Sequence, residues 1–280
     1  MRKALLACSA LVVPLLFAVS SRSQLATTTS VPNWVGNLTS ASTNFLTLVP
    51  ATDPIMADPA TTESASDNPP HMPRGSVYKL FGTAQNGLDP QNPYNDVISF
   101  DTTNGAIAGA FRILGDHVQV KMLTNQIELK YYLLNRTCGG GSPRIQLAID
   151  GDGDGSFKQS PGSPDQNAFG YLGDKAFGGG CPANMWVHED MTDNAPKWDL
   201  SQWVPLPVCD MTCTWQEVVA YFQTNWPNHR VLNAVLVDDS SSFFTLGAGC
   251  ASFDLVNTGA RTYTNREDAS GNGSAQNNCP

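Results

Sequence analysis

The segment Val118–Leu134, VQVKMLTNQIELKYYLL, is the stretch that most directly indicates the fold class. Within residues 118–122, and again within 127–134, polar side chains occupy alternate positions between apolar ones. This period of two is typical of an antiparallel strand that buries one face and exposes the other. The segment therefore predicts two strands, at residues 118–122 and 127–134.

Short apolar runs of this kind recur between clusters of Gly, Asn, Asp and Pro from about residue 76 to residue 266. Because such runs are typical of strands joined by turns, we also predict strands at 77–81, 96–100, 107–114, 144–149, 168–172, 185–189, 231–237, 251–257 and 261–263. One helix is predicted at about 213–226, where Thr214 and Glu217 fit a capping box and Pro227 ends the apolar pattern. Many short strands with a single helix indicate an all-β antiparallel sandwich, which we expect to be of the jelly-roll type.

The remaining segments differ in composition from this β-sandwich domain, which we place at residues 75–266. Residues 1–20 combine a basic start, a short apolar run and small residues at the end, and they predict a signal peptide cleaved after Ser20. Residues 21–74, rich in Ser, Thr and Pro, predict a linker or arm, and residues 267–280 predict a polar tail. No later segment approaches the roughly 20 apolar residues of a membrane span, so we expect a secreted protein, extracellular or periplasmic.

The charge of the chain restricts its partners. Its 16 Lys and Arg residues against 25 Asp and Glu residues give a formal net charge of −9. An acidic chain without a basic stripe repels phosphate, so we expect no nucleic acid partner. The same charge is compatible with divalent cations and with neutral ligands such as sugars.

The cysteines predict disulfides. Seven cysteines become six when Cys8 leaves with the signal peptide, and an even number in an exported chain is typical of disulfide pairing. Six cysteines allow several connectivities. Runs of three glycines beside two of the cysteines could bring that pair together, two others lie four residues apart, and the last two remain. We therefore expect Cys138–Cys181, Cys209–Cys213 and Cys250–Cys279.

The repeat DGDGDG at residues 150–155 follows directly on a predicted strand. In a curled loop, residues two apart can turn their carboxylates toward one point, and such a group of oxygens is what Ca²⁺ prefers. The interposed glycines let the backbone curl without a steric penalty. The pattern therefore predicts a structural calcium site formed by Asp150, Asp152, Asp154 and Ser156.

The repeat matches only the first half of an EF-hand loop. Pro161 stands where that loop needs its closing carboxylate, and a predicted strand replaces the first helix. A strand-to-loop site would therefore need another closing ligand, for which Asp165, Asp174 and Asn167 are the candidates. The alternative is a solvated Asp-Gly turn between two strands.

A second candidate site lies in residues 185–203, MWVHEDMTDNAPKWDLSQW, which hold three tryptophans among polar residues. Flat aromatic faces together with amides and carboxylates are the groups that bind sugars. The predicted ligand-binding residues are Trp186, Trp198, Trp203, Asp193 and Asn194. The alternative is that the tryptophans pack the core and hold long loops in place.

Catalysis has one candidate residue. Between residues 75 and 266, glutamate occurs only at 128, 189 and 217. Glu217 is expected to cap the helix and Glu128 to face solvent, which leaves Glu189 as a possible general acid in a glycosidase-like site. No Gly-x-Ser-x-Gly elbow or glycine-rich phosphate loop occurs. We therefore favour a protein without catalytic activity.

Three segments resemble known proteins. YNDVISFDTT…GAFRIL (94–114) resembles the opening strands of secreted jelly-roll modules, and residues 231–258 resemble their closing strands. Carbohydrate-binding modules of this type often end with a strand of the pattern A-x-x-D-N-V, from which this chain departs because Leu255 replaces the second polar residue. TCGGGSPRIQLAID (137–150) resembles uncharacterised exported bacterial β-sandwich proteins. The resemblance implies the β-sandwich fold most directly, a structural calcium less directly, and carbohydrate binding least directly.

The leading hypothesis is an exported, non-catalytic β-sandwich that binds a glycan or cell-surface polymer and holds a structural calcium. One alternative is a secreted hydrolase that acts on polysaccharide through Glu189. Another is a surface protein with only a structural role.

Overall fold

The computed structural model describes residues 77–279 except 104–105, 116, 140–141, 161, 174–178, 211, 240–247, 260 and 272–276. The predicted signal peptide and arm, residues 1–74, lie outside the described residues. In the part of the chain that the structure describes, no helix is both long enough and apolar enough to span a membrane.

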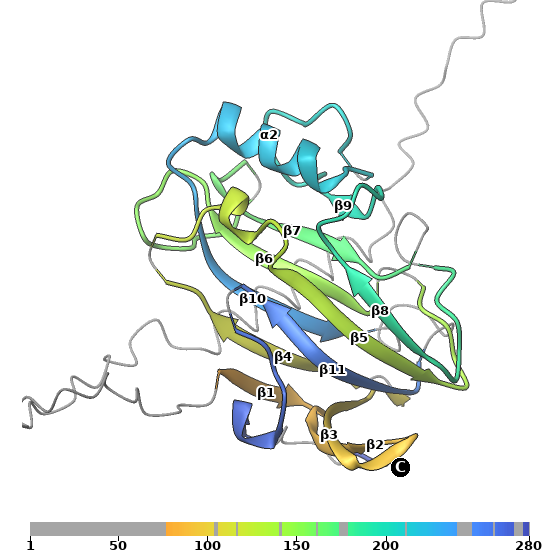
Figure 1. Ribbon diagram of the computed structural model, residues 1–280. Coiled ribbons are helices and arrows are strands. Elements are labelled where there is room, and N and C mark those ends of the chain that lie inside the picture. The colour runs from red at the N-terminus through yellow and green to blue at the C-terminus, as the bar shows by residue number, and fades with distance from the viewer. Residues whose placement is uncertain are drawn as a thin grey trace, which may run out of the picture. The chain divides into compact units, whose positions relative to one another are not determined.

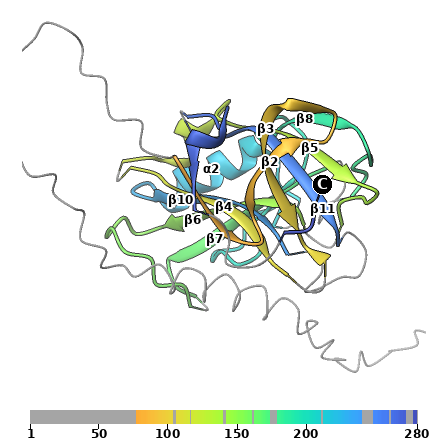
Figure 2. The same cartoon turned by 90° about the horizontal axis from the view of Figure 1, so that it is seen from below.

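Two sheets form the domain (Figures 1 and 2), which is the antiparallel β-sandwich predicted from the sequence. The larger sheet contains, in order, β12 (Ala269–Ser270), β1 (Tyr78–Gly82), β4 (Ala108–Ile113), β10 (Arg230–Asp238), β6 (Arg144–Asp150), β7 (Asp165–Tyr171) and β9 (Trp198–Asp199). The smaller sheet contains β2 (Gln85–Asp89), β3 (Asn92–Asp101), β11 (Cys250–Thr258), β5 (Ile127–Leu134) and β8 (Trp186–Asp190). All neighbours pair antiparallel except β1 and β12.

The core lies between the two sheets. Ile145, Leu147 and Ile149 occupy alternate positions of β6 and have no exposed surface. Leu129 and Tyr131 of β5 belong to the same cluster of buried side chains. Fully burying an aliphatic side chain of this size stabilises a fold by roughly 1.5–3 kcal/mol. Because these side chains lie on alternate positions, burying them together determines which face of the strand turns inward.

Two of the predicted strands are wrong. Residues 120–123 form a short 3-10 helix, η2 (Val120–Leu123), in which Val120 and Leu123, three residues apart, are the buried side chains. The Val120 N–H donates to Nε2 of His229 (3.0 Å), so a side chain satisfies it in place of a neighbouring strand. Residues 261–263 make only the single bridge between Asn257 and Thr262.

The predicted helix is confirmed as α2 (Trp215–Asn225). Thr214 caps it, because its side chain accepts the Glu217 N–H while the Glu217 carboxylate accepts the Thr214 N–H. The helix lies beyond one end of the strands (Figure 1). Its buried face includes Phe222, which packs edge-on against Trp203 with 4.6 Å between ring centroids.

All three expected disulfides are present in the structure: Cys138–Cys181, Cys209–Cys213 and Cys250–Cys279. The first joins the segment after β5 to the segment before β8, and the second closes a small loop before α2. The third joins the start of β11 to the tail. Several disulfides in one domain are typical of proteins that fold in an oxidising compartment.

Strand β11 contains a bulge at the position where the chain departs from the A-x-x-D-N-V pattern. Its pairing with β5 shifts between Asp254 and Asn257, and Leu255 has a φ of 47°. This left-handed conformation is uncommon for a branched apolar residue and far more common for asparagine. The bulge therefore places leucine in a backbone conformation that asparagine adopts more easily.

Candidate functional site

The structure brings the three aspartates of the DGDGDG repeat together. Asp150 is the last residue of β6, where it lies opposite Asp165 of β7 on one side and Arg230 of β10 on the other. It has no exposed surface, whereas Asp152 and Asp154 are exposed. One carboxylate oxygen from each of the three lies within 4.8 Å of the others.

The repeat curls because its own carboxylates bind its backbone. Oδ1 of Asp150 accepts the Gly153 N–H and Oδ2 accepts the Gly155 N–H, both at 2.7 Å. Gly153 and Gly155 have φ values of 75° and 86°, a conformation that favours glycine. Oδ1 of Asp154 accepts both the backbone N–H and the hydroxyl of Ser156, at 2.7 and 2.6 Å. The loop is thus an Asp-Gly turn that also gathers three negative charges.

Asp165 adds a fourth carboxylate. Its side chain is 4% exposed, and Oδ2 accepts the Lys158 N–H at 2.7 Å. Its other oxygen, Oδ1, is buried and has no hydrogen-bond partner among the described residues. Burial raises the pKa of the Asp165 carboxyl, and the negative charges of the three loop aspartates raise it further. A buried, unsatisfied acceptor beside like charges is costly without a cation.

The other two candidate closing ligands are less well supported. Asn167, two residues further along β7, has no exposed surface, and its Oδ1 also lacks a partner among the described residues. Its Nδ2 donates to Oε1 of Gln159 at 3.0 Å. Asp174 lies outside the described residues. Asp165 lies outside the group of three whose oxygens fall within 4.8 Å of one another, but among the candidates it is the carboxylate that lies opposite Asp150 and has a free buried oxygen.

This donor set fits calcium. It offers carboxylate and hydroxyl oxygens without nitrogen or sulfur, and Ca²⁺ takes about six to eight such oxygens, with water filling the remaining positions. A second group, Asp101 with Cys250 and Cys279, also lies close enough for a metal. Because those two cysteines form a disulfide, they are not available as thiolate ligands.

The tryptophans do not gather on one surface. Trp198 and Trp203 have no exposed surface, and their indole N–H groups donate to the backbone oxygens of Met191 and Asn167. The stacking role predicted for these two rings does not fit this placement, which matches the alternative of core packing. Trp186, half-buried on β8, donates its N–H to Oδ1 of Asp89 at 3.0 Å.

The two polar residues predicted beside the tryptophans lie in the loop between β8 and β9. Asp193 and Asn194 are both exposed. Oδ2 of Asp193 accepts a hydrogen bond from Nζ of Lys197 at 2.9 Å. Of the predicted ligand-binding residues, only Trp186, Asp193 and Asn194 retain surface that a ligand could contact.

Glu189 takes part in a buried ion pair. Its side chain is 7% exposed, its Oε1 lies 2.9 Å from Nζ of Lys197, and the Gly173 N–H donates to its carboxylate. Burial alone would lower the pKa of Lys197, but its hydrogen bonds and ion pairs with Glu189 and Asp193 outweigh burial and raise it. The described geometry thus holds Glu189 as a charged partner of a buried lysine rather than as a proton donor facing a cleft.

Sequence reasoning missed a second buried charge cluster. Asp238 and Asp239 at the end of β10 are almost fully buried. Asp239 binds the guanidinium of Arg144 through both oxygens at 2.8 and 2.9 Å, and Asp238 pairs with Arg136. Arg144 at the start of β6 meets Asp239 because β6 and β10 run antiparallel and bring these ends together, a contact that no local sequence signal indicates.

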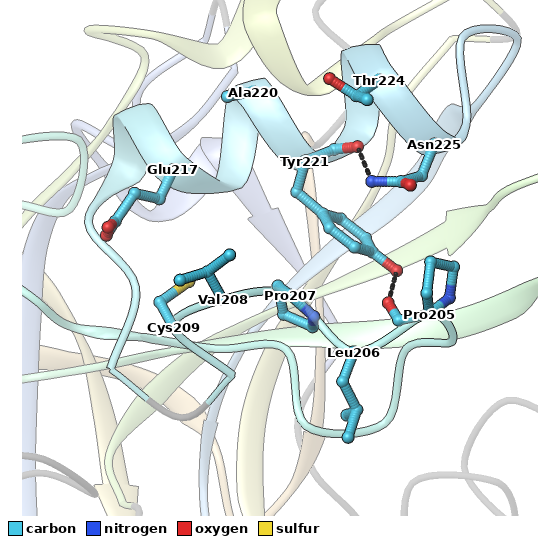
Figure 3. A pocket seen from close by; sticks show the side chains of 10 residues that line it. All are labelled: Pro205, Leu206, Pro207, Val208, Cys209, Glu217, Ala220, Tyr221, Thr224 and Asn225. Carbon is cyan, nitrogen blue, oxygen red and sulfur yellow. Dashed lines mark hydrogen bonds between the residues drawn. The ribbon is translucent and has the colours of Figure 1, made fainter.

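Two cavities lie at the end of the domain that carries α2. The first, about 420 Å³, lies between residues 205–209 and the helix (Figure 3). Two of its polar groups are engaged, since the Tyr221 hydroxyl donates to the Pro205 oxygen at 2.7 Å and Nδ2 of Asn225 donates to the Tyr221 oxygen at 3.0 Å. The second, about 400 Å³, lies beside the DGDGDG loop and is lined mainly by polar residues.

Comparison of the chain with protein families, curated proteins and solved structures found no match in any of the three. The resemblance to carbohydrate-binding modules therefore stays a prediction.

Proposed function

We propose that the protein is an exported β-sandwich that binds a glycan or another surface polymer without catalysis and is stabilised by one calcium ion. The calcium is bound by Asp150, Asp152, Asp154 and Ser156 of the loop, and Asp165 completes its coordination. The single observation that carries this proposal is the buried Oδ1 of Asp165, which has no hydrogen-bond partner in the described part of the chain and belongs to the residue opposite Asp150 in the register of β6 and β7.

A cation accounts for this arrangement better than an empty turn does. Three carboxylates near one point repel each other, and Ca²⁺ would join them. Asp165, opposite Asp150 on the neighbouring strand, would supply its free oxygen as a further ligand. Since the unfolded chain has no such cluster, calcium binding would stabilise the folded state.

Two further observations support export and the absence of catalysis. Three disulfides are typical of exported proteins. Glu189, the candidate general acid, is held in a buried ion pair with Lys197.

Thermal unfolding of residues 21–280 in EDTA and in millimolar calcium tests the proposal. A free calcium concentration about a hundredfold above Kd stabilises the fold by about 2.7 kcal/mol. For a domain of this size that corresponds to a rise in Tm of roughly 5–10 °C. The expected result is such a rise in the wild type and its loss in Asp152→Asn. Equal Tm values in EDTA and calcium would overturn the proposal.

A further inference from the structure

We infer that the polar cavity beside the DGDGDG loop is the ligand-binding site, that its ligand is a neutral saccharide, and that binding requires the calcium-loaded loop. The term polar cavity refers to the space lined by His117, Gln119, Asp152, Asn228 and Arg230. This inference rests on the proposed calcium site and adds a location and a ligand class to it.

Several side chains of the polar cavity are free to bind. Those of His117 and Asn228 make no hydrogen bond within the described part of the chain, and Arg230, which makes none either, lies beside the loop where its charge acts on Asp154. His117 and Asn228 are also exposed. In the cavity under α2, by contrast, the Tyr221 hydroxyl and the Asn225 amide are bound within the protein. Gln119 and His229 of the polar cavity are bonded within the protein, but the side chains of His117 and Asn228 remain available to a ligand.

The chemistry of these groups favours hydroxyls. Arg230 and Asn228 offer N–H donors, while the Asp152 carboxylate only accepts. A sugar hydroxyl both donates and accepts, so neighbouring hydroxyls can satisfy both kinds of group at once. An anionic ligand would meet the carboxylates of the DGDGDG loop and be repelled.

The polar cavity and the calcium loop share a wall. Gly153 packs so closely on the backbone at residue 228 that a Cβ there would lie 2.5 Å from the Asn228 oxygen. Arg230 lies opposite Asp150 in the register of β6 and β10. The curl of the loop thus sets where Asp152 stands in the cavity wall. Calcium, by joining Asp150, Asp152 and Asp154, would fix that position.

Affinity electrophoresis of residues 21–280 tests this inference. The gels contain xylan, glucomannan or dextran as neutral polymers, or polygalacturonate as an acidic one, with millimolar calcium or with EDTA. We expect at least one neutral polymer to retard the protein in calcium and not in EDTA. Asn228→Ala and His117→Ala should each weaken that retardation about fivefold, since each removes a hydrogen bond worth about 1 kcal/mol. Gln223→Ala, an exposed amide of α2 outside the polar cavity, is the matched control and should leave it unchanged.

The same variants separate failure of this inference from failure of the calcium proposal. If calcium raises Tm but Asn228→Ala and His117→Ala bind as the wild type does, the inference is overturned and the calcium site stands. If Asn194→Ala abolishes retardation instead, the ligand lies on the loop between β8 and β9. Retardation by polygalacturonate alone, or by no polymer, also contradicts the inference. No rise in Tm with calcium contradicts the proposed function first.

Discussion

Replacing Asp165 with asparagine removes one negative charge from the DGDGDG site while it keeps the size and shape of the side chain. In EDTA, the wild type holds a buried carboxylate near three others. The amide removes the repulsion, and its oxygen can still accept the Lys158 N–H. Because Asp152 and Asp154 are exposed, water screens the repulsion. We therefore expect a gain of only about 1 kcal/mol, or roughly 2–4 °C in Tm.

In calcium the effect of the same substitution reverses. A neutral amide is a weaker ligand than a carboxylate, so the calcium affinity should fall about tenfold or more. A tenfold loss of affinity in excess calcium removes about 1.4 kcal/mol of the stabilisation that calcium provides. The variant should therefore be more stable than the wild type in EDTA but not in millimolar calcium.

Differential scanning calorimetry of the wild type and the variant, each in EDTA and in calcium, measures this reversal of their relative Tm values. Glu128→Gln, which removes one negative charge from an exposed pair with His188 on the smaller sheet, is the control and should shift little under either condition. If Asp165→Asn unfolds at a lower temperature than the wild type in EDTA, the cluster is not under electrostatic strain. If the variant gains as much from calcium as the wild type, Asp165 is not a ligand. Either result would refute the reasoning.

Three further predictions concern the rest of the domain. Glu189→Gln should cost about 3 kcal/mol in urea unfolding, because it leaves a buried lysine with one partner fewer. Burial lowers the pKa of His229 from its usual 6.5, so the unfolded state binds more protons just below that pH and stability should fall as pH drops through about 6.5. His229→Gln, which keeps an acceptor for the Val120 N–H, should flatten that dependence between pH 7.5 and 5.5. Leu255→Asn should raise the stability by about 0.5–1 kcal/mol, since asparagine adopts a φ of 47° more easily.

Each of these predictions has an outcome that contradicts it. Normal stability of Glu189→Gln together with loss of a polysaccharide-cleaving activity would favour the hydrolase alternative. An unchanged pH profile in the His229 variant would show that another group titrates. A lower Tm for Leu255→Asn would mean that the packing of the leucine side chain outweighs the cost of its left-handed backbone conformation. Circular dichroism at several temperatures and pH values measures the last two.

Local patterns explain most of what the sequence predicted about the fold. The strand at residues 127–134 keeps its bounds in β5 because a period of two leaves one buried face. Thr214 and Glu217 cap α2 through contacts three residues apart. The prediction at 118–122 was wrong because the chain there buries Val120 and Leu123, three residues apart, in a 3-10 turn. His229, a residue more than a hundred positions away, accepts the Val120 N–H and stabilises that turn.

Long-range packing explains what the sequence did not predict about the site. The DGDGDG loop was visible because its ligands are neighbours in the chain. Whether a tryptophan faces solvent depends on what covers it, and Phe222 of α2 packs against Trp203. The partner of Asp239 is Arg144, which lies 95 positions away. No local pattern separates such a buried carboxylate from one in an exposed turn.

The most direct test of the calcium site is isothermal titration of calcium into residues 21–280 after removal of bound metal with EDTA. We predict one calcium ion bound per chain in the wild type and at least tenfold weaker binding in Asp152→Asn. No binding, or binding that Asp152→Asn leaves unchanged, would contradict the account and leave the DGDGDG loop as a turn.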